Sequence, residues 1–151
     1  MYHFFSEHEH IHDTYIDIVG SDVNHIKNVL RLKTGDSLLI SSGDNIDYTC
    51  HIAQIDEEHI RADIDSVDER GRELASKIYL FQGLPKADKM ELVIQKAVEL
   101  GAFEVIPVAM KRSVVKLDAK KAESKVKRWN AIAESAAKQS KRSILPQVSE
   151  L

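Results

Sequence analysis

The sequence has a single cysteine, Cys50, and no histidine after His59. One cysteine cannot form an internal disulfide. No apolar run approaches the roughly 18 residues that a membrane-spanning helix needs. The start of the chain also lacks the charged-then-apolar layout of a signal peptide. These absences predict a protein of the reducing cytoplasm that has no membrane partner.

Several catalytic and cofactor motifs are missing as well. Neither GxGxxG nor GxxxxGK[ST] occurs, so no nucleotide-binding fingerprint is present. The sequence has no pair of carboxylates at a spacing typical of acid–base catalysis. It also has no Ser/His/Asp or Cys/His set distributed over predicted loops as a catalytic triad or dyad would be. His8, His10 and His12 would share one face if they formed a strand, but no further Cys or His lies at a matching spacing. We therefore expect neither a self-contained hydrolase nor a metal site.

The net charge of −3 hides a strong asymmetry along the chain. Residues 1–75 contain 6 lysines and arginines against 16 aspartates and glutamates, a net charge of −10. Residues 76–151 contain 15 against 8, a net charge of +7. Two regions of opposite sign suggest two bodies, of which the basic one can attract a polyanion by neutralising phosphates. Lysine-rich helices are also common as solvated surfaces, so the charge pattern alone leaves both interpretations open.

The first region has the pattern of short strands separated by turns. Residues 36–41 and 47–55, joined by Gly43-Asp44-Asn45, predict a hairpin, and residues 59–67 predict a third strand with Ile60, Ala62 and Ile64 on one face. Several strands of this kind form a small barrel. Residues 21–33 predict one helix, capped by Ser21 or Asp22, whose apolar stripe is Val23, Ile26, Val29 and Leu30.

The second region follows a charged linker at residues 68–74 and alternates strands with helices. Residues 76–84 and 103–110 are apolar enough for strands buried on both faces. A helix between them places five residues on one stripe and ends at Gly101: Met90, Val93, Ile94, Ala97 and Val98. A long helix over residues 119–141 leads to a last strand that begins near Ile144. Its predicted inward residues are Ala122, Val126, Trp129, Ile132, Ala133, Ala136 and Ala137. This order predicts a parallel sheet with right-handed crossovers.

A dense cationic patch lies within the acidic first region. His25, Lys27, Arg31 and Lys33 lie on the end of the predicted helix and on the turn that follows. Such a cluster suits contact with nucleic acid. Cations near a helix C-terminus are also favoured by the helix dipole, which remains the alternative explanation.

Further candidates lie in the basic region. Lys86 stands beside a helix start, where the dipole disfavours a cation, and this favours anion binding. Arg112 and Ser113 follow a buried parallel strand, and ligands of α/β sheets bind at such strand ends. Gln139 and Arg142 close the following helix. Arginine can hold phosphate and glutamine can read a base edge, although helix capping explains Arg142 equally well.

Four blocks of sequence carry a resemblance to a known family. They are HIKNVLRLKTGD at residues 25–36, LPKADKMELVIQKAVELG at 84–101, VIPVAMKRSVVK at 105–116 and RWNAIAESAAKQSKRSILPQV at 128–148. In this order and spacing they closely resemble the 16S ribosomal RNA uridine-N3 methyltransferases of the SPOUT superfamily. The match covers essentially the whole chain.

The resemblance implies an α+β chain of two domains. Residues 1–70 would form a PUA-like small β-barrel for RNA recognition, and residues 71–151 the front part of an α/β SPOUT methyltransferase domain, without its trefoil knot. It implies a cytoplasmic enzyme of ribosome biogenesis, a homodimer when full length, that uses S-adenosylmethionine to methylate N3 of a uridine in 16S rRNA of the small ribosomal subunit. The cationic patch and Lys86 would then contact RNA. Arg112, Ser113, Gln139 and Arg142 would line the rim of a substrate or cofactor pocket, and no catalytic base is assigned.

The family's cofactor-binding signature, a GPEGG-like loop, does not occur in the sequence and is expected beyond residue 151. The resemblance therefore implies a fragment that is inactive by itself. Two other hypotheses remain open. One is a non-catalytic RNA-binding module that acts through the PUA-like domain, and the other is a different α/β protein whose terminal strand is completed by a partner chain.

Overall fold

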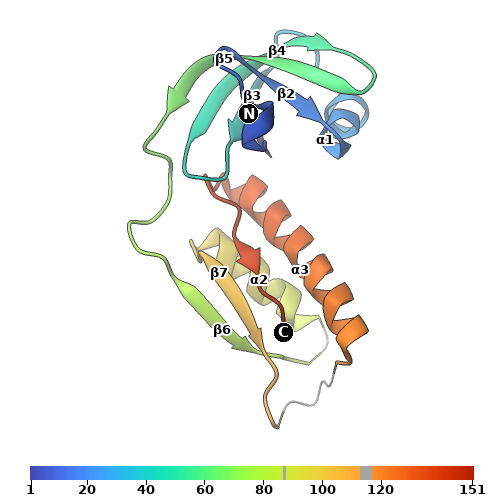
Figure 1. Ribbon diagram of the computed structural model, residues 1–151, viewed down its shortest axis with the longest axis vertical. Helices are drawn as coiled ribbons and strands as arrows, with labels where there is room; N and C mark the ends of the chain where they lie inside the picture. The colour runs from blue at the N-terminus through green and yellow to red at the C-terminus, as the bar shows by residue number, and fades with distance from the viewer. Residues whose placement is uncertain (87, 113–116) are drawn as a thin grey trace. The chain divides into compact units, whose positions relative to one another are not determined.

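A change from a mainly antiparallel sheet to a parallel one divides the chain (Figure 1). The computed structural model describes residues 1–86, 88–112 and 117–151. The chain separates into two compact units, Met1–Arg72 (unit 1) and Glu73–Leu151 (unit 2). The boundary that the resemblance implies, between residues 70 and 71, lies slightly before this division, which falls within the linker expected at residues 68–74. No helix among the described residues is long and apolar enough to cross a membrane.

Unit 1 is built on a five-stranded sheet in the order β1-β3-β4-β5-β2. The strands are β1 Tyr2–Phe5, β2 Tyr15–Val19, β3 Ser37–Ser41, β4 Asp47–Ile55 and β5 His59–Asp68. The predicted hairpin is confirmed, because β3 and β4 pair antiparallel with Leu38 opposite Cys50. With β1 and β2 at its two edges the sheet curls into a half-barrel, in agreement with the barrel-like domain predicted from the sequence.

Alternation along the strands of unit 1 fills its core. Ile60 and Ala62 of β5 are fully buried, as the period of two predicts, and Ile64 packs beside them. Residues from β2, β3 and β4 and from the helical segment complete the same cluster: Ile16, Ile26, Leu38, Ile40 and Ile52. Every strand except the edge strand β1 therefore contributes a fully buried isoleucine or leucine to one core, to which β1 adds the nearly buried Phe4.

The helical segment of unit 1 differs from its prediction in two respects. It consists of α1, Ser21–Asn24, continued by a π-helix, His25–Val29, and Gly20 occupies the N-cap without a side-chain cap. Val23 and Ile26 are buried as predicted, but Val29 is 62% exposed. The wider π-turn, closed by the bond from Leu30 N–H to the His25 carbonyl at 2.9 Å, rotates Val29 away from the stripe.

Unit 2 alternates strands and helices as predicted. Its elements are β6 Tyr79–Gly83, α2 Lys89–Glu99, β7 Glu104–Val108, α3 Ala119–Ser140 and β8 Gln147–Val148. The three strands pair in parallel in the order β6-β7-β8. Met90, Ile94 and Val98 of α2 are buried, and so are Trp129, Ala133, Ala136 and Ala137 of α3. The other residues predicted to face inward are only partly buried: Val93, Ala97, Ala122, Val126 and Ile132. The helical periods therefore identified the centre of each inward face and overestimated its width, and the last strand begins at Gln147 rather than near Ile144.

The sheet of unit 2 is covered on one face only among the described residues. The prediction that β6 is buried on both faces is wrong, because Tyr79 is 46% and Phe81 is 69% exposed. α2 and α3 pack against each other and so lie on the same side of the sheet (Figure 1). Val105 and Val148 point to that side and are buried. The opposite side presents aromatic side chains to solvent.

Gly101 ends α2 as predicted and touches the segment that enters unit 2. Its φ of +101° is a left-handed conformation that favours glycine. The N–H of Ala102 donates to the Ala97 carbonyl at 2.9 Å, which closes the turn. A Cβ at this position would lie 2.7 Å from Leu74 Cδ1. Glycine thus allows the helix end and the entering segment to approach each other.

Candidate functional site

The helical segment of unit 1 ends in a turn that places Arg31 in an unusual backbone conformation. The N–H of Leu32 donates to the Ile26 carbonyl at 3.0 Å, so Arg31 occupies the left-handed position after the helix, with φ +54°. Glycine or asparagine is the usual residue there, because a side chain costs about 1–2 kcal/mol in this conformation. Arg31 is exposed and forms no ion pair with any described residue. Its charge is therefore available to a partner.

The other three residues of the predicted patch are placed differently. Lys33 is exposed and forms no ion pair with a described residue, while its backbone N–H is held at 2.7 Å by the Asp36 carboxylate. The Lys27 ammonium donates to the Asp56 carbonyl at 2.9 Å and so holds the turn between β4 and β5. His25 is exposed, with its ring edge-on to Phe4 at 6.2 Å. The patch therefore offers two unpaired cations, Arg31 and Lys33.

The four residues predicted to line a pocket rim in unit 2 are not brought together. Arg112 is exposed near the end of β7, and Ser113 lies outside the described residues. Gln139 is exposed in the last turn of α3, at the opposite end of that helix. A helix of this length, Ala119–Ser140, separates its ends by about 30 Å. Arg112 and Gln139 therefore cannot contact one small ligand together within this unit.

Arg142 is a structural residue rather than a rim residue. Only 7% of its side chain is exposed, and its guanidinium forms an ion pair with Glu73, which is 11% exposed. The same guanidinium donates to the carbonyls of Val98 at 3.0 Å and Ala102 at 2.6 Å. It therefore caps the C-terminal end of α2, so the capping explanation holds, although for a neighbouring helix rather than its own.

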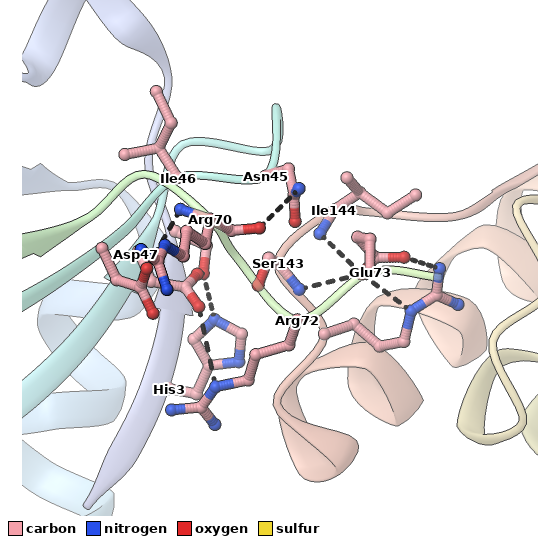
Figure 2. A network of polar contacts seen from close by, with 12 residues as sticks. His3, Asn45, Ile46, Asp47, Arg70, Arg72, Glu73, Ser143 and Ile144 are labelled. Atoms are coloured by element: carbon pink, nitrogen blue, oxygen red, sulfur yellow. Dashed lines mark hydrogen bonds and ion pairs between the residues drawn. The ribbon is translucent and has the colours of Figure 1, made fainter. Parts of the chain in front are cut away.

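Glu73 also fixes the chain after α3. Its carboxylate accepts hydrogen bonds from the backbone N–H of Ser143 at 3.0 Å and of Ile144 at 3.3 Å (Figure 2). One carboxylate thus joins the segment entering unit 2, the end of α2 and the segment leading to β8. Sequence reasoning assigned Glu73 to a linker. No local signal distinguishes it, because its partners lie about 70 residues further along the chain.

The residues just before Glu73 are held by unit 1. The Asn45 amide donates to the Arg70 carbonyl at 3.0 Å, and the Arg72 guanidinium lies 3.8 Å from the Asp47 carboxylate (Figure 2). A Cβ on Gly71, whose φ is +61°, would overlap the Asn45 side chain. Consecutive residues therefore contact different units, Arg72 unit 1 and Glu73 unit 2.

Asp47 belongs to a buried polar cluster inside unit 1. Its carboxylate accepts a hydrogen bond from the Ser41 hydroxyl, and His3 Nε2 lies 2.7 Å from the same hydroxyl. His3, Ser41 and Asp47 are all buried. The cluster ties β1 to the hairpin of β3 and β4 within the interior of unit 1.

The sole cysteine is not a nucleophile. Burial, with smaller contributions from Asp65 and Asp63, raises the pKa of the Cys50 thiol to about 12. A thiol of this kind is protonated at neutral pH, and Cys50 has no exposed surface. Its role is to fill the core of unit 1.

The histidine-rich segment HEHIH does not form the strand that a shared metal face would require. Residues 8–10 form a 3-10 helix, so the three histidines diverge to different carboxylates. His8 lies 3.2 Å from Asp44, and His12 lies 3.3 Å from Asp17. Glu7, Glu9 and His10 bring their potential ligand atoms within 4.8 Å of one another at the surface. Exposed acidic groups are often this close without a metal.

Two family models match the chain. The model of an RNA methyltransferase domain matches residues 72–151, and the model of an RNA methyltransferase PUA domain matches residues 18–65. The first match covers the whole of unit 2 and the second lies within unit 1.

Relatives with similar sequences and structures span both units. The chain is 42% identical over 134 residues to ribosomal RNA small subunit methyltransferase E of Bacillus subtilis, a match that covers 89% of this chain and 52% of that protein. It is 32% identical over 125 residues to ribosomal RNA small subunit methyltransferase E 2 of Borreliella burgdorferi, covering 83% and 51%. The crystal structure of the Neisseria gonorrhoeae methyltransferase E bound to S-adenosylmethionine matches with a TM-score of 0.86 at 28% identity, covering 99% and 61%. The chain thus spans about half the length of the curated relatives it matches.

Proposed function

Because the chain belongs to the RNA methyltransferase family whose domain model matches residues 72–151, we propose that it acts in the methylation of small-subunit ribosomal RNA. The proposed reaction transfers a methyl group from S-adenosylmethionine to N3 of a uridine in 16S rRNA. Similarity to methyltransferase E of Bacillus subtilis and Neisseria gonorrhoeae supports this reaction class. A homodimer in the cytoplasm is the proposed assembly.

The residues of this chain act on the RNA side of the reaction. Arg31 is the observation that carries the proposal, since an exposed, unpaired arginine occupies a position where the backbone favours glycine. With Lys33 it would hold phosphates and so orient the RNA strand, because cations supply most of the affinity for a nucleic-acid backbone. Lys27 would support this contact indirectly, by holding the turn at Asp56.

The described residues of unit 2 do not fit the cofactor. S-adenosylmethionine carries a sulfonium cation near the group that is transferred. The loops after β6 and β7, where an α/β sheet binds ligands, present Lys86, Lys111 and Arg112, whose charge has the same sign. No step of the methyl transfer is therefore derived from these residues.

This charge mismatch favours a second candidate function, a non-catalytic RNA-binding module. Calorimetric titration with S-adenosylmethionine tests whether this chain holds the cofactor. Dissociation constants near or above 1 mM, equivalent to about 4 kcal/mol, are expected both of a non-catalytic module and of an enzyme that lacks its cofactor loop. Micromolar binding would show a cofactor site and exclude the non-catalytic module.

The test of the RNA contact is Arg31→Gly. Removing a side chain from a left-handed position relieves about 1–2 kcal/mol, of which glycine's greater backbone entropy offsets roughly 0.5–1, so unit 1 should be stabilised by about 1 kcal/mol or less. Loss of a phosphate contact should at the same time weaken binding to a 16S rRNA fragment and reduce its salt slope by about 0.7 to 0.9. Urea unfolding and fluorescence anisotropy measure the two effects.

Lys141→Gly is the matched control. Lys141 also follows a helix in a left-handed conformation, with φ +56°, and is exposed, so this variant removes the same charge and relieves the same backbone conformation. It should stabilise unit 2 without changing RNA affinity. If Arg31→Gly leaves the salt slope unchanged, or if both variants weaken binding equally, the assignment of Arg31 is wrong.

A further inference from the structure

Five exposed lysines lie at the end of unit 2 where its helices begin. One follows β7 and the others lie on the first turns of α3: Lys111, Lys120, Lys121, Lys125 and Lys127. We call them the carboxyl-edge lysines. None of them was among the candidate residues derived from the sequence.

The topology of the parallel sheet brings this group together. β6 and β7 run in the same direction, so the segments after Gly83 and after Val108 emerge at one edge of the sheet. Each helix begins at that edge and returns to the other, and Figure 1 shows the start of α3 at the same end of unit 2 as the ends of β6 and β7. The lysines at the start of α3 therefore lie at the same edge as Lys111, with Lys120 and Lys127 on one side of the helix and Lys121 and Lys125 about 100–140° around it. This edge is where α/β sheets bind ligands.

Two lysines of unit 2 that lie away from this edge have carboxylate partners, whereas three of the carboxyl-edge lysines have none among the described residues. Lys96 lies 2.9 Å from Glu99, and Lys138 lies 2.9 Å from Glu134. Lys121 lies 3.5 Å from Asp118 at the surface. Lys120, Lys125 and Lys127 form no ion pair with any described residue.

Helix stability does not explain the lysines at the start of α3. The N-terminal end of a helix dipole favours acidic side chains and disfavours cations. The first turn of α3 has no acidic residue, and only its N-cap, Asp118, satisfies this preference by accepting from Lys121 N–H at 2.8 Å. The charge of this region therefore opposes the local preference of the helix, so an anionic partner is the more direct explanation for it.

We infer that the carboxyl-edge lysines form a phosphate-binding surface for the RNA strand that approaches the methylation site. This inference rests on the proposed function, and it adds a contact surface in unit 2 to the patch of unit 1. Lys120 and Lys127 are separated by about 10 Å along α3, enough for more than one phosphate of a strand. Because lysine contacts the phosphates and not the base edges, this surface positions the RNA without sequence specificity.

The test compares two triple variants of the full 151-residue chain that lose the same charge. Lys120→Ala, Lys125→Ala and Lys127→Ala together remove the unpaired carboxyl-edge lysines. The control combines Lys77→Ala, Lys96→Ala and Lys141→Ala, which lie at the opposite edge of the sheet, where β6 begins and the helices end. Fluorescence anisotropy with a short fluorescein-labelled oligouridine measures affinity across a series of salt concentrations. Trp129 fluorescence verifies that unit 2 is folded in each variant.

The first triple variant should lower affinity about tenfold or more at low salt and reduce the salt slope by about 2, whereas the control should change the slope by less than about 0.5. Equal losses of RNA affinity in the two triple variants would show an effect of net charge only and would overturn the inference. The inference would also be overturned if the first variant lost binding to anionic lipid vesicles while its RNA affinity stayed unchanged. If wild type binds no RNA at all, the proposed function fails. If only Arg31→Ala with Lys33→Ala reduces binding, the proposed function stands and this inference fails.

Discussion

Unit 1 has an excess of acidic side chains, several of which contact its own histidines and arginines, whereas unit 2 leaves cations exposed at one edge. His51 lies 2.8 Å from Asp65, and Arg61 lies 2.8 Å from Asp63. The exposed cations of unit 1 that form no ion pair with a described residue are Arg31, Lys33 and Arg70. The net charge of a unit is therefore a poor guide to where RNA binds. What matters is which charges lack an internal partner.

Unit 2 contains a buried ion pair between Glu73 and Arg142. Replacing Glu73 with alanine tests its contribution to stability, and this substitution should have the largest effect of those proposed. The change leaves the Arg142 guanidinium buried without its counter-charge, which typically costs about 3–5 kcal/mol. Glu73→Gln should cost less, because an amide oxygen can still accept from Ser143 and Ile144. Urea unfolding followed by the fluorescence of Trp129, the only tryptophan and a buried residue of unit 2, reports the loss.

The matched control for Glu73→Ala is Glu91→Ala in the same unit. Glu91 forms a two-point ion pair with Arg128, with one N···O distance of 3.2 Å, but Arg128 is 65% exposed. The loss should be much smaller than that of Glu73→Ala, because solvent screens an exposed ion pair. Equal effects of the two changes would mean that burial of the Glu73 pair does not persist in solution. Alkylation of Cys50, which reports unfolding of unit 1, should be unchanged by either variant.

Sequence reasoning recovered what depends on local periodicity and missed what depends on distant partners. Ile94 and Val98 were identified by helical spacing, and Ile60 by alternation, since both periods are set by neighbouring residues. Val29 was misplaced because a single π-turn changes the period. Arg142 was assigned to a pocket rim because its partner Glu73 lies 69 residues away. The exposure of Phe81 depends on both helices lying on one face, which no strand sequence encodes.

Raising the pH should lower the free energy of unfolding of unit 1 but not of unit 2. The expected effect is smaller than that of Glu73→Ala and larger than that of Phe81→Thr. Burial and the nearby Asp65 and Asp63 raise the pKa of Cys50 to about 12, whereas an unfolded thiol titrates near 8.5. Above about pH 8.5 the unfolded chain loses a proton that the folded unit 1 retains, so its stability should fall by about 1.4 kcal/mol per pH unit. Below pH 8.5 this contribution is fully present.

Urea unfolding of unit 1, followed by far-UV circular dichroism between about pH 8.5 and 10, measures this slope, and Cys50→Ala should abolish it. Tyr48, whose pKa is raised chiefly by burial and then by Asp44, adds to the slope only at higher pH. Unit 2, which has no cysteine, should show no such slope in Trp129 fluorescence. A slope that survives in Cys50→Ala would assign the effect to another group.

The smallest change in stability is expected for a substitution on the exposed face of the unit 2 sheet. A matched substitution on the buried face provides the comparison. Phe81→Thr and Val105→Thr introduce the same strand-favouring residue on opposite faces. Phe81 is mostly exposed, so its replacement should change stability by no more than about 0.5 kcal/mol, whereas Val105 is fully buried and a hydroxyl there should cost about 1–3 kcal/mol. A loss at Phe81 as large as that at Val105 would mean that this face is covered in solution. If that loss disappeared on dilution, a second copy of the chain would be the cover, because only an intermolecular contact depends on protein concentration.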